Sequence, residues 1–144
     1  MSSEIVIKFL VAAVLAGTAF LFGTVGEILS EKVGHLNLGV EGMMSIGACA
    51  GFMVGYQTDN FVAALLAAAV AGMLSALIYG VLTVTFMANQ NVTGLTLTIF
   101  GVGLANFIGV FMLEKSENGT LKLPDAVTAQ MRNIHIPGLS DLPV

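Results

Sequence analysis

The sequence predicts an all-α membrane protein, a polytopic helix bundle with about four hydrophobic segments. The composition is 56% hydrophobic and only 10% charged, whereas soluble globular domains average roughly 25% charged residues. The mean hydropathy is +0.93. The charges are also unevenly placed, since none occurs between Lys8 and Glu27 or between Asp59 and Glu114. About 20 uncharged residues suffice to cross a bilayer once, so the longer stretch accommodates two crossings.

The first two segments differ in how clearly they predict a crossing. Residues 5–25 form an uninterrupted apolar run, longer than the core of a secretory signal and without its small-residue cleavage site, so we expect a retained span. Residues 36–56 are less apolar, and their clean apolar part begins only at Met43. This segment crosses if residues 36–42 also enter the membrane. The alternative is a broken or re-entrant segment.

Residues 61–87 and 92–113 form the third and fourth predicted spans, separated by a polar break at residues 89–91. Residues 1–113 are therefore the predicted transmembrane region, and residues 114–144, which contain three prolines, are a predicted loop or tail. Lys8 favours a cytoplasmic N-terminus. The tail lies on the same side if all four segments cross, and on the opposite side if the second is re-entrant.

Small residues recur at every fourth position in three of the segments. In a membrane such stripes allow helix backbones to approach closely. We expect them to pack the bundle, with a dedicated dimer interface as the alternative. The predicted packing residues are Gly47, Gly51, Gly55, Ala68, Gly72, Ala76, Gly101, Ala105 and Gly109.

The polar stretch 26–42, between the first two segments, is the first candidate for function. Glu27, Glu31 and His35 would share one face of a short interfacial helix. We expect this face to be solvated and expect no metal site. Asn37 and Glu41 flank Gly39, where the backbone can break and re-enter as a helix. Glu41 then either favours the start of that helix or, with Asn37, lines a translocation path.

Asn91 ends the polar break at residues 89–91, and Thr93 and Thr96 follow it. A turn accounts for the amides, but uncharged hydrogen-bonding groups would also suit a sugar or nucleoside. No phosphate-binding glycine motif occurs, and no grouping of side chains suggests a catalytic residue, so we predict neither a cofactor nor an enzyme. A net charge of -4 with five basic residues argues against nucleic-acid binding.

The run GEILSEKVGHLNLGVEGMMSIGACAGFMVGY resembles the N-terminal half of a bacterial ABC-importer permease for simple sugars or nucleosides, a group related to branched-chain amino acid permeases. The matching residues are Gly26, Glu27, Ile28, Glu31, Lys32, Gly34, residues 36–42, Met43 and Met44. The later run ANQNVTGLTLTIFGVGLANFIG and the final IPGLSDLPV also resemble that group, so the similarity covers nearly the whole chain.

The resemblance implies a multi-pass subunit of the bacterial inner membrane. Its partners would be the lipid bilayer, a second permease subunit, a cytoplasmic ATPase subunit that binds the ATP, and a periplasmic or lipid-anchored solute-binding protein. The resemblance also implies that residues 36–42 lie close to the path or its gate. Because permeases of this group are about twice as long and dock on the ATPase through their second half, we expect a truncated or split N-terminal half.

Two other functions are compatible with four apolar segments. A small proton-coupled exporter acting as a homodimer would require a titratable carboxylate deep in a span, and the first span has none between Glu4 and Glu27. A non-transporting membrane scaffold would show changed stability, but no change in flux, when Asn37 or Glu41 is replaced.

Overall fold

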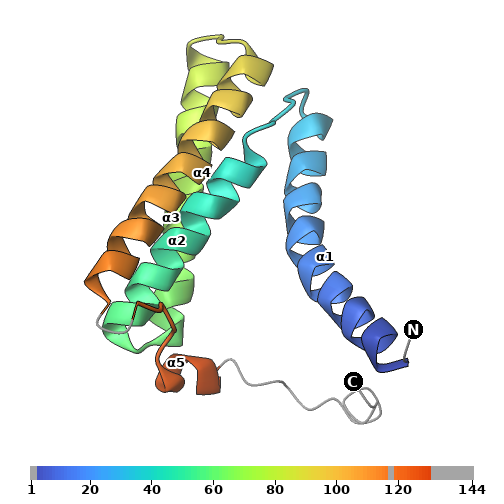
Figure 1. Ribbon diagram of the computed structural model, residues 1–144. Coiled ribbons are helices and arrows are strands. Elements are labelled where there is room, and N and C mark those ends of the chain that lie inside the picture. Colours follow the sequence, from blue (N-terminus) through green and yellow to red (C-terminus); the bar gives the residue numbers. More distant parts are fainter. Residues whose placement is uncertain (1–2, 117–118, 131–144) are drawn as a thin grey trace.

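Over the described residues the chain forms a bundle of four long helices, and a short helix lies beneath the bundle (Figure 1). The computed structural model describes residues 3–116 and 119–130. Within them the elements are α1 (Ser3–Lys32), α2 (Val40–Thr58), α3 (Phe61–Gly80) with a π-helical turn (Val81–Thr85), α4 (Gln90–Lys115) and α5 (Asp125–Gln130). The predicted all-α membrane bundle is confirmed, since three helices are long and apolar enough to cross a membrane.

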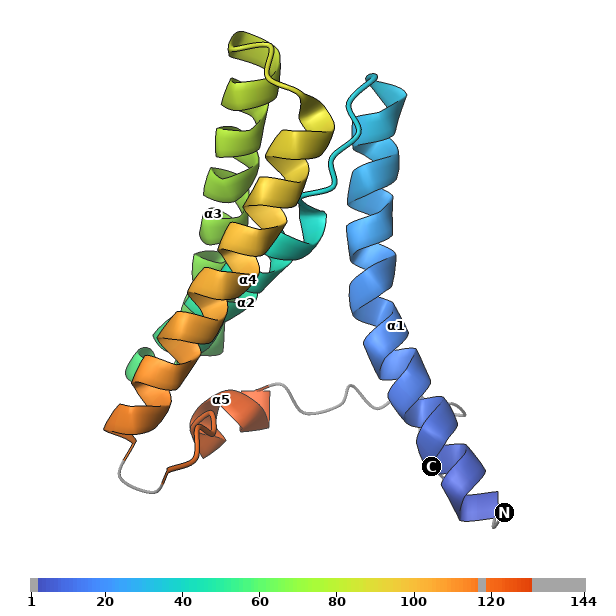
Figure 2. The same cartoon turned by 45° about the horizontal axis from the view of Figure 1, so that its top comes forward.

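Helix α2 lies at the centre, packed on both α3 and α4. Helix α1 runs alongside and diverges from the other three toward its N-terminal end (Figures 1 and 2). The three membrane-length helices are α1, α3 with its π-helical turn, and α4. Helix α2 is the exception, yet it is a single unbroken helix of 19 residues. It is antiparallel to α3, which begins after a short turn (Figure 1).

Helix α1 is longer than the predicted 5–25 segment. It continues to Lys32, so Glu27 and Glu31 lie in its last turns instead of on a separate interfacial helix. The helix ends where Gly34 adopts a φ of 86°, a conformation that glycine reaches at little cost. The N–H of Gly34 donates to Glu31 O at 2.9 Å, and the N–H of His35 donates to Ser30 O at 3.0 Å. His35 therefore lies outside the helix that carries Glu27 and Glu31.

The other segment bounds also shift by a few residues. Helix α2 begins at Val40, so residues 36–39 are not helical. Asn60 caps α3, with its side chain accepting from the N–H groups of Val62 and Ala63. Asn89 caps α4 by accepting from the N–H of Val92, which places the start of this helix within the predicted polar break. Helix α4 then extends to Lys115, and the later tail residues 131–144 lie outside the described ranges.

Small residues form the contact between α2 and α3. Gly47, Gly51 and Gly55 are buried on one face of α2. A Cβ added at Gly51 would lie 2.9 Å from the Cβ of Ala68, and one at Gly47 would lie 3.1 Å from the Ala68 carbonyl oxygen and 3.9 Å from Gly72 N. Any larger side chain on this face of α2 would push the two backbones apart.

The predicted stripe of small residues on α4 consists of Gly101, Ala105 and Gly109. Only the beginning of this stripe packs against α2. A Cβ at Gly101 would meet the Gly42 Cα at 2.7 Å, whereas one at Gly109 would have no atom within 4 Å. Ala105 is half-buried. Ala76, on α3, is exposed and borders a hollow between α1, α2 and α3. Gly94, which was not among the predicted packing residues, would place a Cβ 2.8 Å from Leu38 N.

Candidate functional site at the junction of α1 and α2

Residues 33–39 join α1 to α2 and are not helical, and we call this segment the 33–39 loop. Its backbone N–H and C=O groups cannot be satisfied by lipid, and each would cost several kcal/mol if left unpaired in the hydrocarbon core. In a membrane protein, non-helical backbone is tolerated where it is buried in protein or lines a water-filled cavity. The partners of these groups therefore show how the loop is held.

Side chains from three helices hold the first part of the 33–39 loop. The N–H of Leu36 donates to the Gln90 side-chain oxygen on α4 at 2.8 Å. The Leu36 carbonyl accepts from the hydroxyl of Tyr79 on α3, also at 2.8 Å. The N–H of Asn37 donates to Glu27 Oε1 on α1 at 2.7 Å. Helices α1, α3 and α4 thus each contribute one polar side chain. Together these three side chains hold the backbone of Leu36 and Asn37.

The second part of the 33–39 loop is held by Thr98 and by Asn37 itself. The Thr98 hydroxyl donates to Leu38 O at 2.7 Å, and the N–H of Gly39 donates to Asn37 Oδ1 at 2.9 Å. The side-chain nitrogen of Asn37 lies 3.7 Å from Met43 Sδ. Asn37 is only 8% exposed. Its side chain therefore shapes the turn that starts α2.

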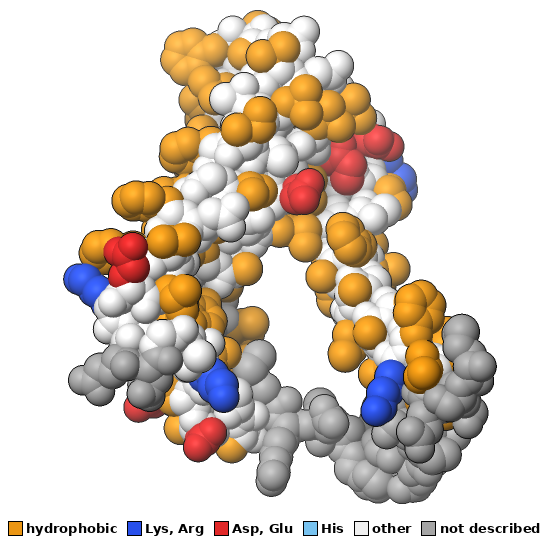
Figure 3. All heavy atoms as spheres, in the orientation of Figure 1, with side chains coloured by type: hydrophobic (Ala, Val, Ile, Leu, Met, Phe, Trp, Pro, Cys, Tyr) orange, Lys and Arg blue, Asp and Glu red, His pale blue; other side chains and the backbone are white. Residues whose placement is uncertain are grey.

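A groove of about 620 Å³ opens between α1 and the beginning of α2, beside the 33–39 loop. Figure 3 shows acidic side chains gathered at this junction. The groove is mostly apolar, with three carboxylates at its polar end. Its lining residues are Ala19, Phe20, Gly23, Thr24, Glu27, Glu31, Leu36, Asn37, Leu38, Val40, Glu41, Met44, Ser45 and Ala48.

Of these carboxylates Glu31 and Glu41 are exposed and Glu27 is half-buried, and Glu41 is the one carried by α2. It lies in the first turn of α2, where the helix dipole favours a negative charge. Gly39 occupies the N-cap position, and no side chain there makes a capping hydrogen bond. Glu41 is exposed. Unlike Asn37, it is thus placed to meet a molecule in the groove.

The other predicted path residues lie elsewhere. Thr93 and Thr96 border a separate hollow of about 360 Å³ between α3 and α4. The Thr96 hydroxyl donates to the carbonyl of Val92 in its own helix at 2.8 Å. Asn91 is exposed in the first turn of α4. The structure therefore brings Asn37 and Glu41 to one groove and does not bring Asn91, Thr93 and Thr96 to it.

Four residues that hold the 33–39 loop were not among the predicted site residues. Glu27 was interpreted as part of a solvated helix face and Gln90 as part of a turn, while Tyr79 and Thr98 were not considered as loop contacts. Tyr79 is 6% exposed. The available signal was a polar group within an otherwise apolar span, which usually faces the protein interior and finds a partner there.

The described residues contain no group of three or more His, Cys, Asp or Glu side chains arranged to hold a metal ion. The end of α1 at Lys32 explains why Glu27, Glu31 and His35 do not share a helix face. The Glu27 carboxylate instead accepts a backbone N–H through one oxygen, and its other oxygen is buried with no hydrogen-bond partner among the described residues.

Comparison with known proteins gives the family. The family model described as "Branched-chain amino acid transport system / permease component" matches residues 9–133. The chain is 35% identical over 126 residues to the "Putative glucose ABC transporter permease protein TsgC13" of Haloferax volcanii, covering 88% of this chain and 38% of that protein. It is 34% identical over 146 residues to the "Guanosine ABC transporter permease protein NupQ" of Bacillus subtilis, covering 96% and 44%.

A third relative, the "Nucleoside ABC transporter permease protein NupC" of Lactococcus lactis, is 28% identical over 134 residues, which cover 88% of this chain and 40% of the relative. The chain thus spans less than half the length of the curated relatives it matches. No solved structure matches it significantly. The family and these relatives are transporter permeases and not enzymes. Together with the three membrane-length helices, the similarity shows that the chain is a multi-pass protein of the cell membrane. The chain belongs to the permease-component family of branched-chain amino acid transport systems.

Proposed function

We propose that the chain forms part of the translocation path of an ATP-driven ABC importer for a simple sugar or a nucleoside. The family match and the names of the relatives, which mention glucose, guanosine and nucleosides, support this class of solute. The sequence has no phosphate-binding glycine motif, so ATP would be bound by a partner subunit.

The partners that this function requires are also part of the proposal. They are a second permease subunit, a cytoplasmic ATPase subunit, and a periplasmic or lipid-anchored solute-binding protein that delivers the solute. The lipid bilayer surrounds the assembly. Hydrolysis of ATP by the ATPase would drive alternating access, and the permease subunits would supply the path.

The observation that carries the proposal is the groove between α1 and α2, with the exposed Glu41 at the start of a helix that follows a break. A carboxylate is an acceptor of several hydrogen bonds, and it binds hydroxyl donors more strongly than a neutral acceptor does. Sugars and nucleosides both present hydroxyl groups. Apolar residues such as Phe20 and Met44 line the rest of the groove and would contact the less polar face of such a solute.

Asn37 is proposed to act beside Glu41 by shaping the turn that presents it. Asn91, Thr93 and Thr96 are proposed as secondary contacts, and Thr93 and Thr96 would reach the solute only from the hollow between α3 and α4.

Replacement of Glu41 tests the proposal. Glu41→Gln removes the charge while keeping the shape of the side chain. The loss of one charge-assisted hydrogen bond predicts a fall in uptake of roughly tenfold or more. Uptake of labelled glucose and of labelled nucleosides is measured with the chain and its transport partners in membranes. Glu114→Gln, at the exposed end of α4, is the matched control. Wild-type uptake by Glu41→Gln would remove this residue from the path.

A further inference from the structure

The peptide group between Leu36 and Asn37 is held from two sides. Its carbonyl accepts from the Tyr79 hydroxyl on α3 at 2.8 Å, and its N–H donates to Glu27 Oε1 on α1 at 2.7 Å. Tyr79 is 6% exposed, so its hydroxyl is fixed by the surrounding bundle. One peptide of the 33–39 loop thus connects α1 to α3.

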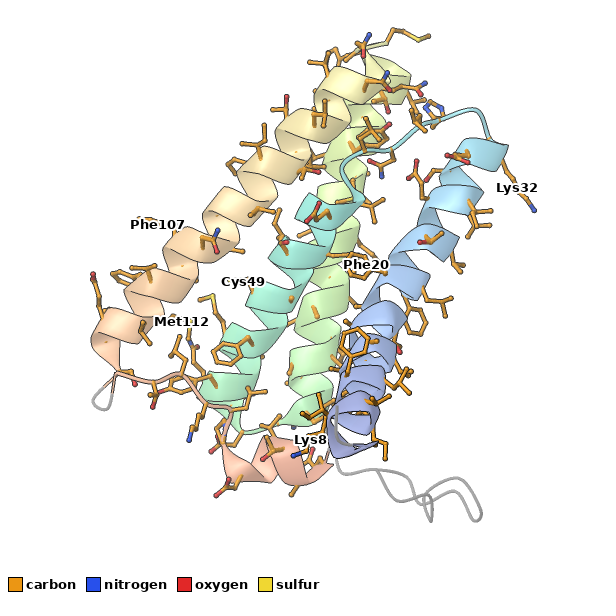
Figure 4. The ribbon with its side chains drawn as sticks, turned by 45° about the vertical axis from the view of Figure 1, so that its right-hand side comes forward. Lys8, Phe20, Lys32, Cys49, Phe107 and Met112 are labelled. Atoms are coloured by element: carbon orange, nitrogen blue, oxygen red, sulfur yellow. The ribbon has the colours of Figure 1, made fainter. Side chains whose placement is uncertain are left out.

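This connection is important because α1 has little other attachment to the bundle. It packs mainly on α2, and large apolar side chains along its length remain exposed, including Phe9 at 70% and Phe20 at 72%. Lys8 and Lys32 mark its two ends in Figure 4. Helix α1 approaches α2 closely at Gly23, where an added Cβ would lie 2.9 Å from Met44 Sδ and 3.4 Å from Val40 Cγ1.

Helix α1 also forms one wall of the groove, with Phe20, Gly23 and Glu27, while the start of α2 forms the other. A shift of α1 against α2 would change the width of the groove directly. The contact that resists such a shift at the closed end of the groove is the charge-assisted hydrogen bond from Asn37 N–H to Glu27.

We propose that Glu27 and Tyr79 are positioning residues: by holding the Leu36–Asn37 peptide from opposite sides, they fix α1 against α2 and set the width of the groove. The proposal rests on the proposed function, because the width of the groove affects transport only if the solute passes through it.

The proposal requires the reach of the Glu27 side chain and not its charge as such. Glu27→Gln keeps an acceptor oxygen at the same distance from the backbone but makes only a neutral hydrogen bond, so it is expected to loosen α1 less than Glu27→Asp does. Glu27→Asp keeps the charge but is one methylene shorter, so its carboxylate no longer reaches the Asn37 N–H. A role for the charge alone, such as attracting a cation, predicts the opposite order.

Disulfide cross-linking across the groove measures the position of α1 without measuring transport. Cysteines are introduced at Gly23 and Val40, whose side-chain positions are close enough to be joined. The native Cys49, on α2 (Figure 4), is replaced by alanine. The rate of oxidative cross-linking is then followed in membranes that contain the chain with its partners. Glu31→Asp, a groove carboxylate one turn further along α1, is the matched control.

The expected result is that Glu27→Asp slows cross-linking roughly tenfold, since a hydrogen bond to a charged group is lost. Tyr79→Phe removes the donor from the other side and is expected to slow cross-linking about fivefold. Glu31→Asp should cross-link at nearly the wild-type rate, and Glu27→Gln at a rate between that of the wild type and that of Glu27→Asp. If Glu27→Asp does not accumulate in the membrane, Tyr79→Phe carries the test alone.

Three results distinguish the proposals. Wild-type cross-linking in both Glu27→Asp and Tyr79→Phe would overturn the positioning role. Slow cross-linking in Glu27→Gln with a normal rate in Glu27→Asp would also overturn it, in favour of a charge role. If cross-linking slows as expected while solute uptake stays at the wild-type level, the positioning role stands and the proposed path through this groove fails.

Discussion

At the scale of single residues, the structure gives different roles to two residues that sequence reasoning had paired. Asn37 is buried, and its side-chain oxygen accepts the Gly39 N–H at 2.9 Å. Glu41 is exposed in the groove. Both were predicted to line a path, but only Glu41 has a side chain free to meet a solute, and Asn37 stabilises the turn before it.

This division predicts different effects for changes at the two positions. Asn37→Leu leaves the buried Gly39 N–H without an acceptor, which costs about 1–3 kcal/mol. We expect a lower midpoint of thermal unfolding in detergent, measured by the loss of a monodisperse peak on size-exclusion chromatography. Val33→Ala, at a side chain of the same loop that is 73% exposed, should unfold near the wild-type temperature. An unchanged midpoint for Asn37→Leu would mean that this hydrogen bond does not hold the turn.

At the scale of elements, the fold depends on the close approach of α2 to its two neighbours. The stripe on α2 was predicted from its spacing alone, because small residues at every fourth position lie on one face of any helix. The partner face of α4 was only partly predictable. Gly101 contacts the Gly42 backbone, whereas Gly109 lies in open space, and sequence spacing cannot show where two helices diverge.

The contact between α2 and α4 gives a prediction at this scale. Gly101→Ala places a Cβ against the Gly42 backbone, at 2.7 Å from its Cα, and backbone cannot move aside as a flexible side chain does. Overpacking of this kind costs about 1–3 kcal/mol. Gly103→Ala is the control, because a Cβ there has no atom within 4 Å. Thermal unfolding in detergent should show a loss of stability for Gly101→Ala alone, and equal midpoints for the two variants would refute the close contact.

At the scale of the whole molecule, the apolar segments and the polar breaks between them predicted the bundle, because long uncharged runs have few alternatives to a membrane helix. The continuation of α1 to Lys32 was not predicted, since charged residues in its last turns were interpreted as a separate helix. The partners of the 33–39 loop were also not predictable. They come from Glu27, Tyr79, Gln90 and Thr98, which are brought together only by the packing of the whole bundle.

The central claim is that solute passes the groove between α1 and α2, and the most direct test is the accessibility of Glu41 during transport. Glu41→Cys in a Cys49→Ala background is treated with a water-soluble thiol reagent while solute uptake is followed. We expect the reagent to block the residual uptake that remains after the loss of the carboxylate, and the transported solute to slow the reaction, because both would occupy the groove. Glu114→Cys, at the exposed end of α4, should react without loss of uptake. A thiol at position 41 that reacts at the same rate with and without solute, and leaves uptake intact, would contradict the account.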